Sequence, residues 1–336
     1  MRIPLGVHLG ERFTLDETWA VADIADKAGF DSLWVAEGRL TRDAIGIMAL
    51  LGDRTSNVRI GSGVVNNKTR NAALMAVTFK TLDEIAPGRI ILGIGAWWEP
   101  LASKVGVPVR KPVTAMREYV GVLKSFFAND EVSMNGEFVQ MDGVRFDRMY
   151  AENEPVDIPV YAGAVGPRML ELSGEIMDGA YLDFLLPVSY LTETALPSIK
   201  RGLAKRADSS GDFDVTQIIA CAVDDDDPRQ AIDACKSFLT LYLMQQPHIA
   251  EHAGVDPAIV EKIQSIAGWP ATPTELKQAM EFVPDEVVLN VAAAGSTAQV
   301  VAKIEEFHDA GVRVPVLNPL GNRKLETVAS LARAFQ

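Results

Sequence analysis

Short apolar runs alternate with helical patterns along the chain, beginning close to its N-terminal residue. Runs rich in Ile, Leu and Val that are bounded by Gly, Asp or Pro are typical of parallel strands buried on both faces. We predict strands near residues 2–9, 32–35, 58–62, 89–94, 158–161, 179–183, 216–223 and 286–291. Helical spacing predicts helices near residues 15–29, 43–54, 72–86, 111–127, 167–177, 189–206, 227–242, 297–310 and 323–335.

Strands that alternate with helices favour either a (β/α)8 barrel or a doubly wound sheet. The first strand is not followed by a Gly-rich phosphate loop, and the strand count reaches eight. Both observations favour an α/β fold of the (β/α)8 TIM-barrel type, with residues 1–336 forming a single domain.

Two intervals are too long for a simple crossover between strands. Residues 128–157 contain two alternating runs around Asn135-Gly136, which predict a hairpin. Residues 244–285 have a helical and loop-like pattern. We expect both intervals to be insertions that form a lid or a subunit contact.

The composition excludes several classes of partner. The net charge of −13 without a basic face argues against nucleic acid, and no run reaches the about 18 uncharged apolar residues of a membrane helix. The two cysteines, Cys221 and Cys235, form no CxxC pair and fit a reducing cytoplasm. His248 and His252 have metal-ligand spacing, but no third ligand accompanies them, so we expect no metal. We therefore expect a cytoplasmic protein whose partner is a small molecule.

Glycines mark the ends of the third and fourth predicted strands, where a barrel places its active-site loops. In GSGVVNN, Gly63 lacks a Cβ and two β-branched residues follow it, which indicates either a continuing strand or a forced bulge. In GIGAWWE, Gly93 and Gly95 leave space for a planar ring to approach the backbone. Trp97 and Trp98 follow; either one of them lines a pocket or both are structural.

The segment AGAVGPR follows the fifth predicted strand and opens a helix. A Gly-rich turn with Pro at the first helical position presents backbone N–H groups to an anion. We therefore predict that the backbone of residues 163–168 binds a phosphate and that Arg168 adds positive charge.

Two polar residues are predicted to face the mouth of the barrel. Glu37 follows the second strand, where it could act as a general acid, a substrate anchor or an ion-pair partner of Arg39 or Arg42. His8 alternates with the apolar face of the first strand, which places it toward the pocket. Imidazole is suited to proton donation near neutral pH, although a buried and satisfied His fits the same pattern.

Together these segments resemble the luciferase-like flavin and deazaflavin oxidoreductases. The resemblance is carried by LWVAEGRLTRDA, RIGSGVVNNKTRNAALMA, VTFKTLDEIAPGRIILGIGAWWEPLASKVG and AGAVGPRMLELSGEIMDG, which cover most of residues 1–183, and by VLNVAAAGSTAQVVAKIEEFHDAGV. Within the family the chain looks most like the methylenetetrahydromethanopterin reductase branch, which uses coenzyme F420. That branch carries a Glu where this chain has His8, and many relatives carry a His where this chain has Gly38.

The resemblance implies a site for each part of the coenzyme. It implies a cis peptide at Gly63-Val64 that presses on the central ring, a phosphate-tail site and a pyrimidine-edge site. The implied cofactor-binding residues are Gly63, Val64, Val65, Asn66, Gly95, Ala96, Trp97, Gly163, Ala164, Val165, Gly166, Pro167 and Arg168. Trp98 and Glu99 are the expected substrate-binding residues, and Glu37 and His8 the expected catalytic residues.

Our leading hypothesis is an F420-dependent reductase that moves hydride between the deazaflavin and a methylene-tetrahydropterin, in either the methanopterin or the folate form, or a related C=N or C=O substrate. The alternatives are an FMN-dependent monooxygenase with the same fold and a non-catalytic deazaflavin binder. Residues 72–85 and 45–51 are apolar enough to form the homodimer contact that is common in the family.

Overall fold

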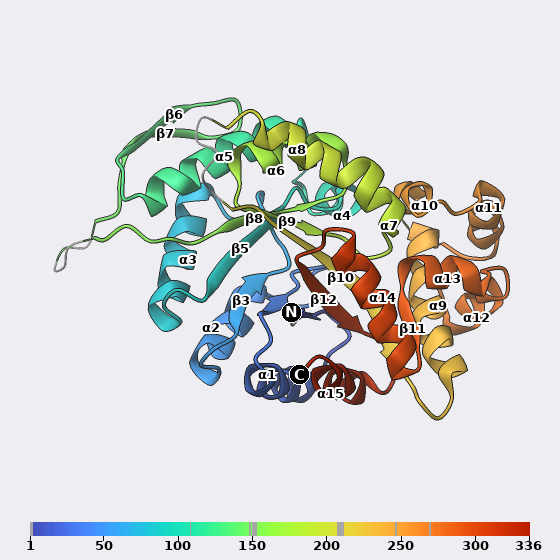
Figure 1. Ribbon diagram of the computed structural model, residues 1–336. Coiled ribbons are helices and arrows are strands. Elements are labelled where there is room, and N and C mark those ends of the chain that lie inside the picture. The colour runs from blue at the N-terminus through green and yellow to red at the C-terminus, as the bar shows by residue number, and fades with distance from the viewer. Residues whose placement is uncertain are drawn as a thin grey trace. The chain divides into compact units, whose positions relative to one another are not determined.

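The computed structural model describes residues 3–107, 109–147, 149, 153–206, 212–245, 247–268 and 270–336 (Figure 1). The chain divides into two compact units. The first, called the N-terminal unit, comprises His8–Tyr181 and Pro197–Val215. The second, called the C-terminal unit, comprises Met1–Val7, Leu182–Leu196 and Thr216–Gln336. The single domain expected from the sequence stays a prediction.

The N-terminal unit contains a sheet of buried parallel strands. In order of pairing these are β2 (Ser32–Val35), β3 (Arg59–Ser62), β5 (Ile90–Gly95), β8 (Val160–Ala164) and β9 (Gly179–Leu182), and the short β4 (Val65–Asn66) pairs with β5. Almost every residue of these strands is buried. This burial explains why the strands are continuous apolar runs rather than alternating patterns, because helices cover parallel sheets on their faces.

Three of the following helices of this unit begin at a residue whose side chain caps them. The helices are α1 (Leu15–Ala28), α2 (Ala44–Arg54), α3 (Ala72–Ile85), α4 (Glu99–Lys104), α5 (Pro112–Phe127) and α6 (Pro167–Ile176). The side chains of Thr14, Asp43 and Asn71 each accept a hydrogen bond from a first-turn N–H of α1, α2 and α3. In contrast, α5 and α6 have Pro in the first turn and no side-chain cap.

The first insertion contains the predicted hairpin, formed by β6 (Val132–Asn135) and antiparallel β7 (Gln140–Val144) (Figure 1). Its connection is residues 136–139 rather than a two-residue turn. The Glu118 carboxylate on α5 accepts the backbone N–H groups of Glu137, Phe138 and Val139 at 2.7–3.0 Å. One side chain therefore ties the turn to α5. Residues 148 and 150–152 of this insertion lie outside the described residues.

The C-terminal unit has its own parallel pairings. Gly6 and Val7 of β1 (Gly6–Leu9) pair with β12 (Val314–Pro319), β12 pairs with β10 (Asp214–Val223), and β10 pairs with β11 (Ala293–Gly295). Helices α9 (Pro228–Gln245), α14 (Thr297–Asp309) and α15 (Lys324–Ala334) belong to the same unit. The chain leaves β10 through α9 and returns to the sheet at β11.

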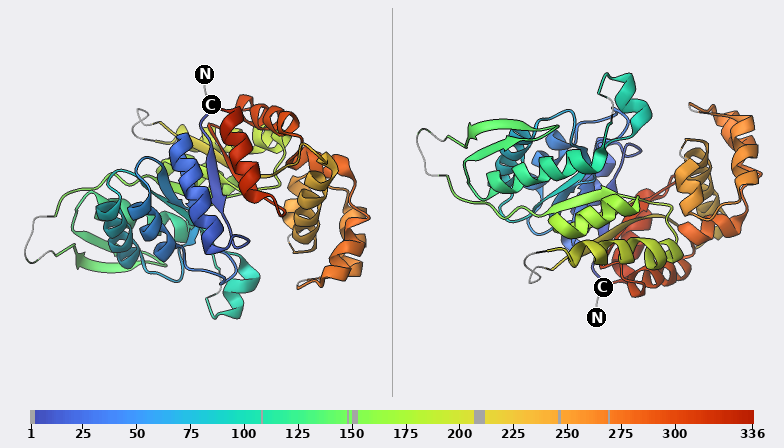
Figure 2. Two further views of the ribbon diagram at one scale, coloured as in Figure 1. Left: turned by 90° about the horizontal axis from the view of Figure 1, so that it is seen from below. Right: turned by 90° about the horizontal axis from the view of Figure 1, so that it is seen from above.

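The second insertion, residues 244–285, is helical as predicted, although residues 246 and 269 lie outside the described residues. Its helices are α10 (Pro247–His252), α11 (Pro257–Ile266) and α12 (Pro273–Met280), and α13 (Asp285–Val291) follows. All four contact α9, and both views of Figure 2 show them gathered beside it.

One predicted strand is wrong. Residues 286–291 form helix α13, because Pro284 is a helix N-cap residue, two acids occupy the first turn, and Val288 and Val291 are buried at helical spacing. The strands of this region are instead β11 and β12. The prediction missed β12, VPVLNP, whose two prolines argue against an interior strand.

A contact between α6 and α8 (Leu196–Leu203) generates a test of the fold. A Cβ on Gly202 would collide with the carbonyl oxygen of Glu171, and one on Gly174 with that of Ile199. Because the backbones meet without room for a methyl group, we expect Gly202→Ala to lower the free energy of unfolding by about 1–3 kcal/mol.

Urea unfolding followed by circular dichroism measures this loss. Gly121→Ala in α5 is the matched control, since its nearest neighbour, the Met134 methyl, lies at an ordinary 3.8 Å. The control is expected to gain up to about 1 kcal/mol from helix propensity. Equal stability of the two variants would contradict the close contact.

Candidate active site

The Gly63-Val64 peptide between β3 and β4 is cis, as the resemblance implies. Beside it, the Ser62 hydroxyl donates to the Gly93 carbonyl at 2.7 Å and accepts from the Gly93 N–H at 3.0 Å. These bonds hold the end of β3 to β5 at the point where the chain direction changes. Val65 follows the cis peptide and is buried.

The glycines at the ends of β5 and β8 make room for the Val64 side chain. A Cβ on Gly95 would lie 2.9 Å from Val64 Cγ2, and one on Gly163 would lie 2.8 Å from the same atom. A Cβ on Gly93 would collide with the Ser62 carbonyl oxygen. The missing Cβ atoms of these glycines therefore make room for the bulge, and the approach of a planar ring to Gly93 and Gly95 stays a prediction.

Two asparagines follow the bulge and differ in their surroundings. Asn66 Oδ1 accepts the N–H groups of Lys68 and Thr69, both at 2.9 Å, so Asn66 shapes the turn after β4. Asn67 is buried, and neither its amide oxygen nor its amide nitrogen has a hydrogen-bond partner among the described residues. The sequence reasoning missed Asn67, because two adjacent asparagines carry no signal that tells them apart.

His8 lies in a dry environment with one defined partner. Its Nδ1 lies 2.9 Å from the Tyr181 hydroxyl oxygen, and only 6% of the residue is exposed. Burial lowers the pKa of His8 to about 4, against the opposing charge of Glu11, so the imidazole is neutral at pH 7. A Cβ on Gly10 would lie 3.3 Å from Nε2 and Cδ2, so this edge of the ring faces the end of β1.

An aromatic layer supports the His8 partner. Tyr181 stacks on Trp34, with ring centroids 4.3 Å apart and planes at 25°, and Trp34 Nε1 donates to Ser32 Oγ at 2.8 Å. A Cβ on Gly63 would lie 3.0 Å from both the Tyr181 hydroxyl oxygen and Trp34 Cβ. The hydroxyl that contacts His8 therefore also lies against the first residue of the cis peptide.

Glu37 is held in an ion pair that the sequence did not identify. Its two carboxylate oxygens accept from Arg70 at 2.8 and 3.0 Å, and it also accepts the Ala44 N–H at 3.3 Å. The hydrogen bonds to Glu37 hold the pKa of Arg70 above its usual value. Of the partners considered from the sequence, Arg39 lies 4.0 Å from Glu11, and Arg42 donates to the Phe13 carbonyl.

The residues after β5 separate into different environments. Trp97 has a positive φ of 73°, which is uncommon for a bulky residue, and Trp98 is the residue before α4, with the Arg39 guanidinium 5.8 Å from its ring centroid. Ala96 and both Trp residues are partly exposed. Glu99 accepts from Ser103 and from the Val109 N–H, so these contacts order α4.

The predicted anion site lies at the start of α6. Gly163 and Ala164 end β8, Val165 follows, and Gly166 and Pro167 begin the helix without a side-chain cap. A surface pocket of about 690 Å³ includes Arg168 on α6 and Lys111, which precedes the equally uncapped α5. Two helix N-termini and two cations thus border one pocket, an arrangement that suits a negatively charged group.

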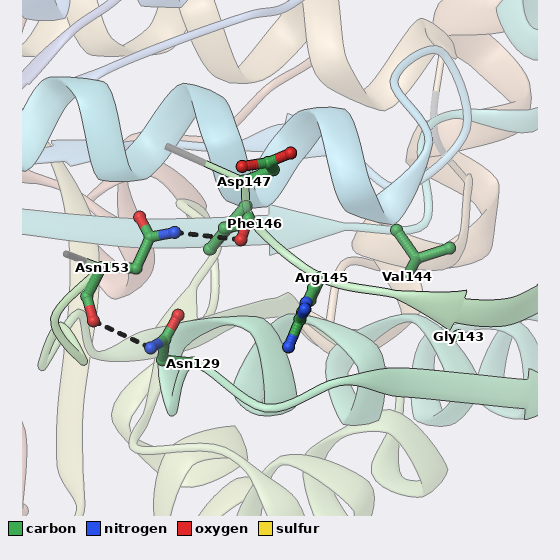
Figure 3. Close-up of a pocket in the computed structure, with 7 residues that line it drawn as sticks. All are labelled: Asn129, Gly143, Val144, Arg145, Phe146, Asp147 and Asn153. Carbon is green, nitrogen blue, oxygen red and sulfur yellow. Dashed lines mark hydrogen bonds between the residues drawn. The ribbon is translucent and has the colours of Figure 1, made fainter. Parts of the chain in front are cut away.

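A second pocket, of about 530 Å³, lies at the other end of α5 (Figure 3). Asn129 Nδ2 donates to the Asn153 carbonyl at 2.8 Å, and Asn153 Nδ2 donates to the Phe146 carbonyl at 3.0 Å. At 1.5 Å per residue, the length of α5 separates this pocket from Lys111 by about 24 Å. The Figure 3 pocket is therefore not part of the predicted anion site.

The described residues were also compared with the requirements of a metal site and of a membrane-spanning helix. Among the residues that the structure describes, no three His, Cys, Asp or Glu side chains are grouped to hold a metal ion. No helix in the described part of the chain is long and apolar enough to cross a membrane.

Comparison with known proteins defines the class. Residues 1–314 match the family model described as luciferase-like monooxygenase, and the chain belongs to this family. The whole chain aligns with a solved coenzyme F420-dependent tetrahydromethanopterin reductase from Methanopyrus kandleri, with a TM-score of 0.85, 24% identity and 100% coverage of both chains. The fold is therefore the (β/α)8 barrel predicted from the sequence.

The chain is also similar to proteins with named activities. The chain is 28% identical over 315 residues to 5,10-methylenetetrahydromethanopterin reductase of Methanolobus tindarius, which covers 93% of each chain. It is 26% identical over 300 residues to F420-dependent glucose-6-phosphate dehydrogenase of Kineococcus radiotolerans, covering 85% of this chain and 82% of the relative.

The burial of His8 predicts a pH dependence of stability. Its pKa is about 4 in the folded state against 6.5 for a free imidazole, so the unfolded chain binds the proton first as the pH falls. Stability is therefore unaffected by His8 above pH 6.5 and decreases between pH 6.5 and 4. At pH 5 we expect the wild type to have lost about 2 kcal/mol through this group.

Urea unfolding at pH 8 and pH 5, in wild type and His8→Gln, isolates the effect. The variant should lose about 2 kcal/mol less than the wild type over this interval, because all other groups are shared. An identical loss in both proteins would mean that His8 is not buried as a neutral group.

Proposed function

We propose that this protein is a coenzyme F420-dependent oxidoreductase and that its substrate is a methylene-tetrahydropterin. The observation that carries the proposal is the match to a methylenetetrahydromethanopterin reductase over 93% of both chains. Relatives with different substrates share the coenzyme in their names, namely a tetrahydromethanopterin reductase and a glucose-6-phosphate dehydrogenase. The coenzyme is therefore the common element, and the pterin is the more specific part of the proposal.

The N-terminal unit has features that suit each part of this coenzyme. When bound, F420 supplies the carbon that carries hydride. We assign its phosphate to the uncapped start of α6, with Arg168, and its ring to the Val64 bulge. The backbone of Ala96 and Trp97 is assigned to the pyrimidine edge. In support of this, the α6 N–H groups lack a side-chain cap and Trp97 holds an unusual backbone conformation.

We assign His8 as the polar group that acts on the substrate. A neutral imidazole in a dry site donates a hydrogen bond from one nitrogen without charge repulsion, which polarises a C=O acceptor. The nitrogen of a C=N+ acceptor has no lone pair, so with a methylene-tetrahydropterin the hydrogen bond would go to the other pterin nitrogen, which receives the electron pair released when the C=N+ bond forms. The Nε2 edge of His8 faces the end of β1, where a barrel places its substrate. We assign Trp98 and Glu99 to the substrate side of the same mouth.

Glu37 has a different assignment within the proposal. Its carboxylate is paired with Arg70 through both oxygens, and Arg70 also contacts Asp43 at 2.5 Å. A carboxylate held in this way orders the loop after β2. Its catalytic role stays a prediction, which Glu37→Gln tests.

The experiment is anaerobic oxidation of reduced F420 by methylene-tetrahydromethanopterin and by methylene-tetrahydrofolate, followed by coenzyme absorbance. We expect turnover with at least one pterin and an about 100-fold lower kcat for His8→Gln. His308→Gln is the matched control, since His308 lies in the last turn of α14 with its Nδ1 2.9 Å from the Val312 carbonyl oxygen.

The outcomes separate the alternatives. Bound yellow FMN with pterin-independent oxygen uptake would replace the proposal with a monooxygenase, the activity in the family description. Tight F420 binding without turnover on either pterin or on any C=O acceptor would indicate a non-catalytic binder. Turnover only with a C=O substrate would retain the coenzyme and exclude the pterin.

We also propose that the protein is a cytoplasmic homodimer. Two adjacent helices, α2 and α3, present Leu50, Leu74, Val77 and Ile85 to solvent. A patch of this kind is self-complementary across a two-fold axis, so a second copy is the partner that it fits. The two cysteines are free and buried, which accords with a reducing compartment.

Sedimentation velocity tests the dimer. We expect the wild type to sediment as a dimer and Leu74→Glu to sediment as a monomer, because a buried charge opposes association. Leu289→Glu, at an exposed leucine of α13, should leave the dimer intact. A monomeric wild type would refute the proposal.

A further inference from the structure

We infer that Tyr181 is a positioning residue that holds the His8 imidazole with its proton on Nε2. The inference rests on the role proposed for His8 and names the group that prepares it. In this role Tyr181 acts through the imidazole rather than by contact with the substrate or the coenzyme.

One of the two imidazole nitrogens of His8, Nδ1, has a defined partner. Tyr181 Oη lies 2.9 Å from Nδ1, and both residues are buried. The other edge of the imidazole, with Nε2, faces Gly10 at the end of β1. The two nitrogens therefore have different surroundings, one closed by Tyr181 and one directed toward the end of the strand.

The contact with Tyr181 is compatible with a proton on either nitrogen, so we assign the tautomer from the hydrogen-bond donor role proposed for Nε2. A neutral imidazole has one N–H donor and one bare acceptor nitrogen. When the Tyr181 hydroxyl donates to Nδ1, the imidazole proton must be on Nε2. The reverse arrangement would leave a bare nitrogen facing the substrate, which accepts a hydrogen bond but cannot donate one.

Several contacts fix the Tyr181 hydroxyl in place. Its ring stacks on Trp34, which donates to Ser32, and its oxygen lies against Gly63. A residue larger than Gly at position 63 would push against this hydroxyl. The same tyrosine thus connects the imidazole to the bulge that we assign to the coenzyme ring.

The charged and titratable groups around His8 are few. Glu11, on the loop after β1, raises the tendency of His8 to bind a proton, and Arg39 lies 4.0 Å from Glu11. Tyr181 is the partner from β9. Burial therefore keeps the imidazole neutral. Tyr181, rather than an ion pair with His8, selects which nitrogen carries the proton.

The first test is the tautomer itself, measured on the ligand-free protein by long-range ¹H–¹⁵N NMR with ¹⁵N-histidine. The chain has four histidines, and the His8 signals are assigned by their loss in His8→Gln. We expect wild-type His8 to show one neutral form, protonated at Nε2, and Tyr181→Phe to show a mixture. A wild-type Nδ1–H form, or an unchanged Tyr181→Phe spectrum, would overturn the inference.

Tyr161→Phe is the matched control. Tyr161 is also buried against Trp34, with ring centroids 5.6 Å apart, but its hydroxyl bonds to Asp214. We expect its removal to leave the His8 tautomer unchanged. If Tyr181→Phe does not fold, the wild-type spectrum alone still decides which nitrogen carries the proton.

The second test is a double-mutant cycle on turnover. We expect Tyr181→Phe to lower kcat about 10-fold with KM unchanged, and His8→Gln with Tyr181→Phe to equal His8→Gln alone. If the fold-losses in kcat of the two single variants instead multiply in the double variant, Tyr181 acts independently of His8. If no pterin turns over, the proposed function fails while the NMR result still decides the inference.

Discussion

The packing of Val64 against two glycines is the contact on which the site depends. Val64 follows a cis peptide, and its methyl groups occupy the volume that a side chain on Gly95 or Gly163 would need. These glycines end β5 and β8, the strands that lead to Trp97 and to the start of α6. Close-packed interiors transmit small changes in volume, so the bulge, the residues around Trp97 and the predicted anion site at the start of α6 are positioned together.

The two polar side chains expected to act in catalysis, His8 and Glu37, are stabilised by different means. His8 is neutral because burial disfavours its charged form, whereas Glu37 is paired with Arg70 at 2.8 Å. A neutral donor and a paired carboxylate can occupy neighbouring strand ends without repelling one another. This division suits hydride transfer, in which the coenzyme carries the reactive carbon and the protein provides a dry, ordered environment.

Local sequence patterns explain the strands and helices that were predicted correctly, and they also explain why residues 286–291 were wrongly predicted as a strand. Buried runs in β2, β3, β5 and β8 are apolar throughout, and capping residues mark the starts of α1, α2 and α3. Residues 286–291 have the same apolar character but form a helix, because Pro284 and two acids precede the valines. β12 contains two prolines and was missed, although it pairs with both β10 and β1. Strand pairing of this kind depends on partners far away in the chain.

The sequence by itself determined the barrel class, the cis bulge through its family motif, and the glycine-rich start of α6, because each is encoded in a short run of residues. Only the tertiary structure decided which groups meet. It paired Glu37 with Arg70, packed Val64 against Gly95, and brought Tyr181 to His8 across 173 residues. These contacts arise from the closure of strands that are distant along the chain, which no local pattern encodes.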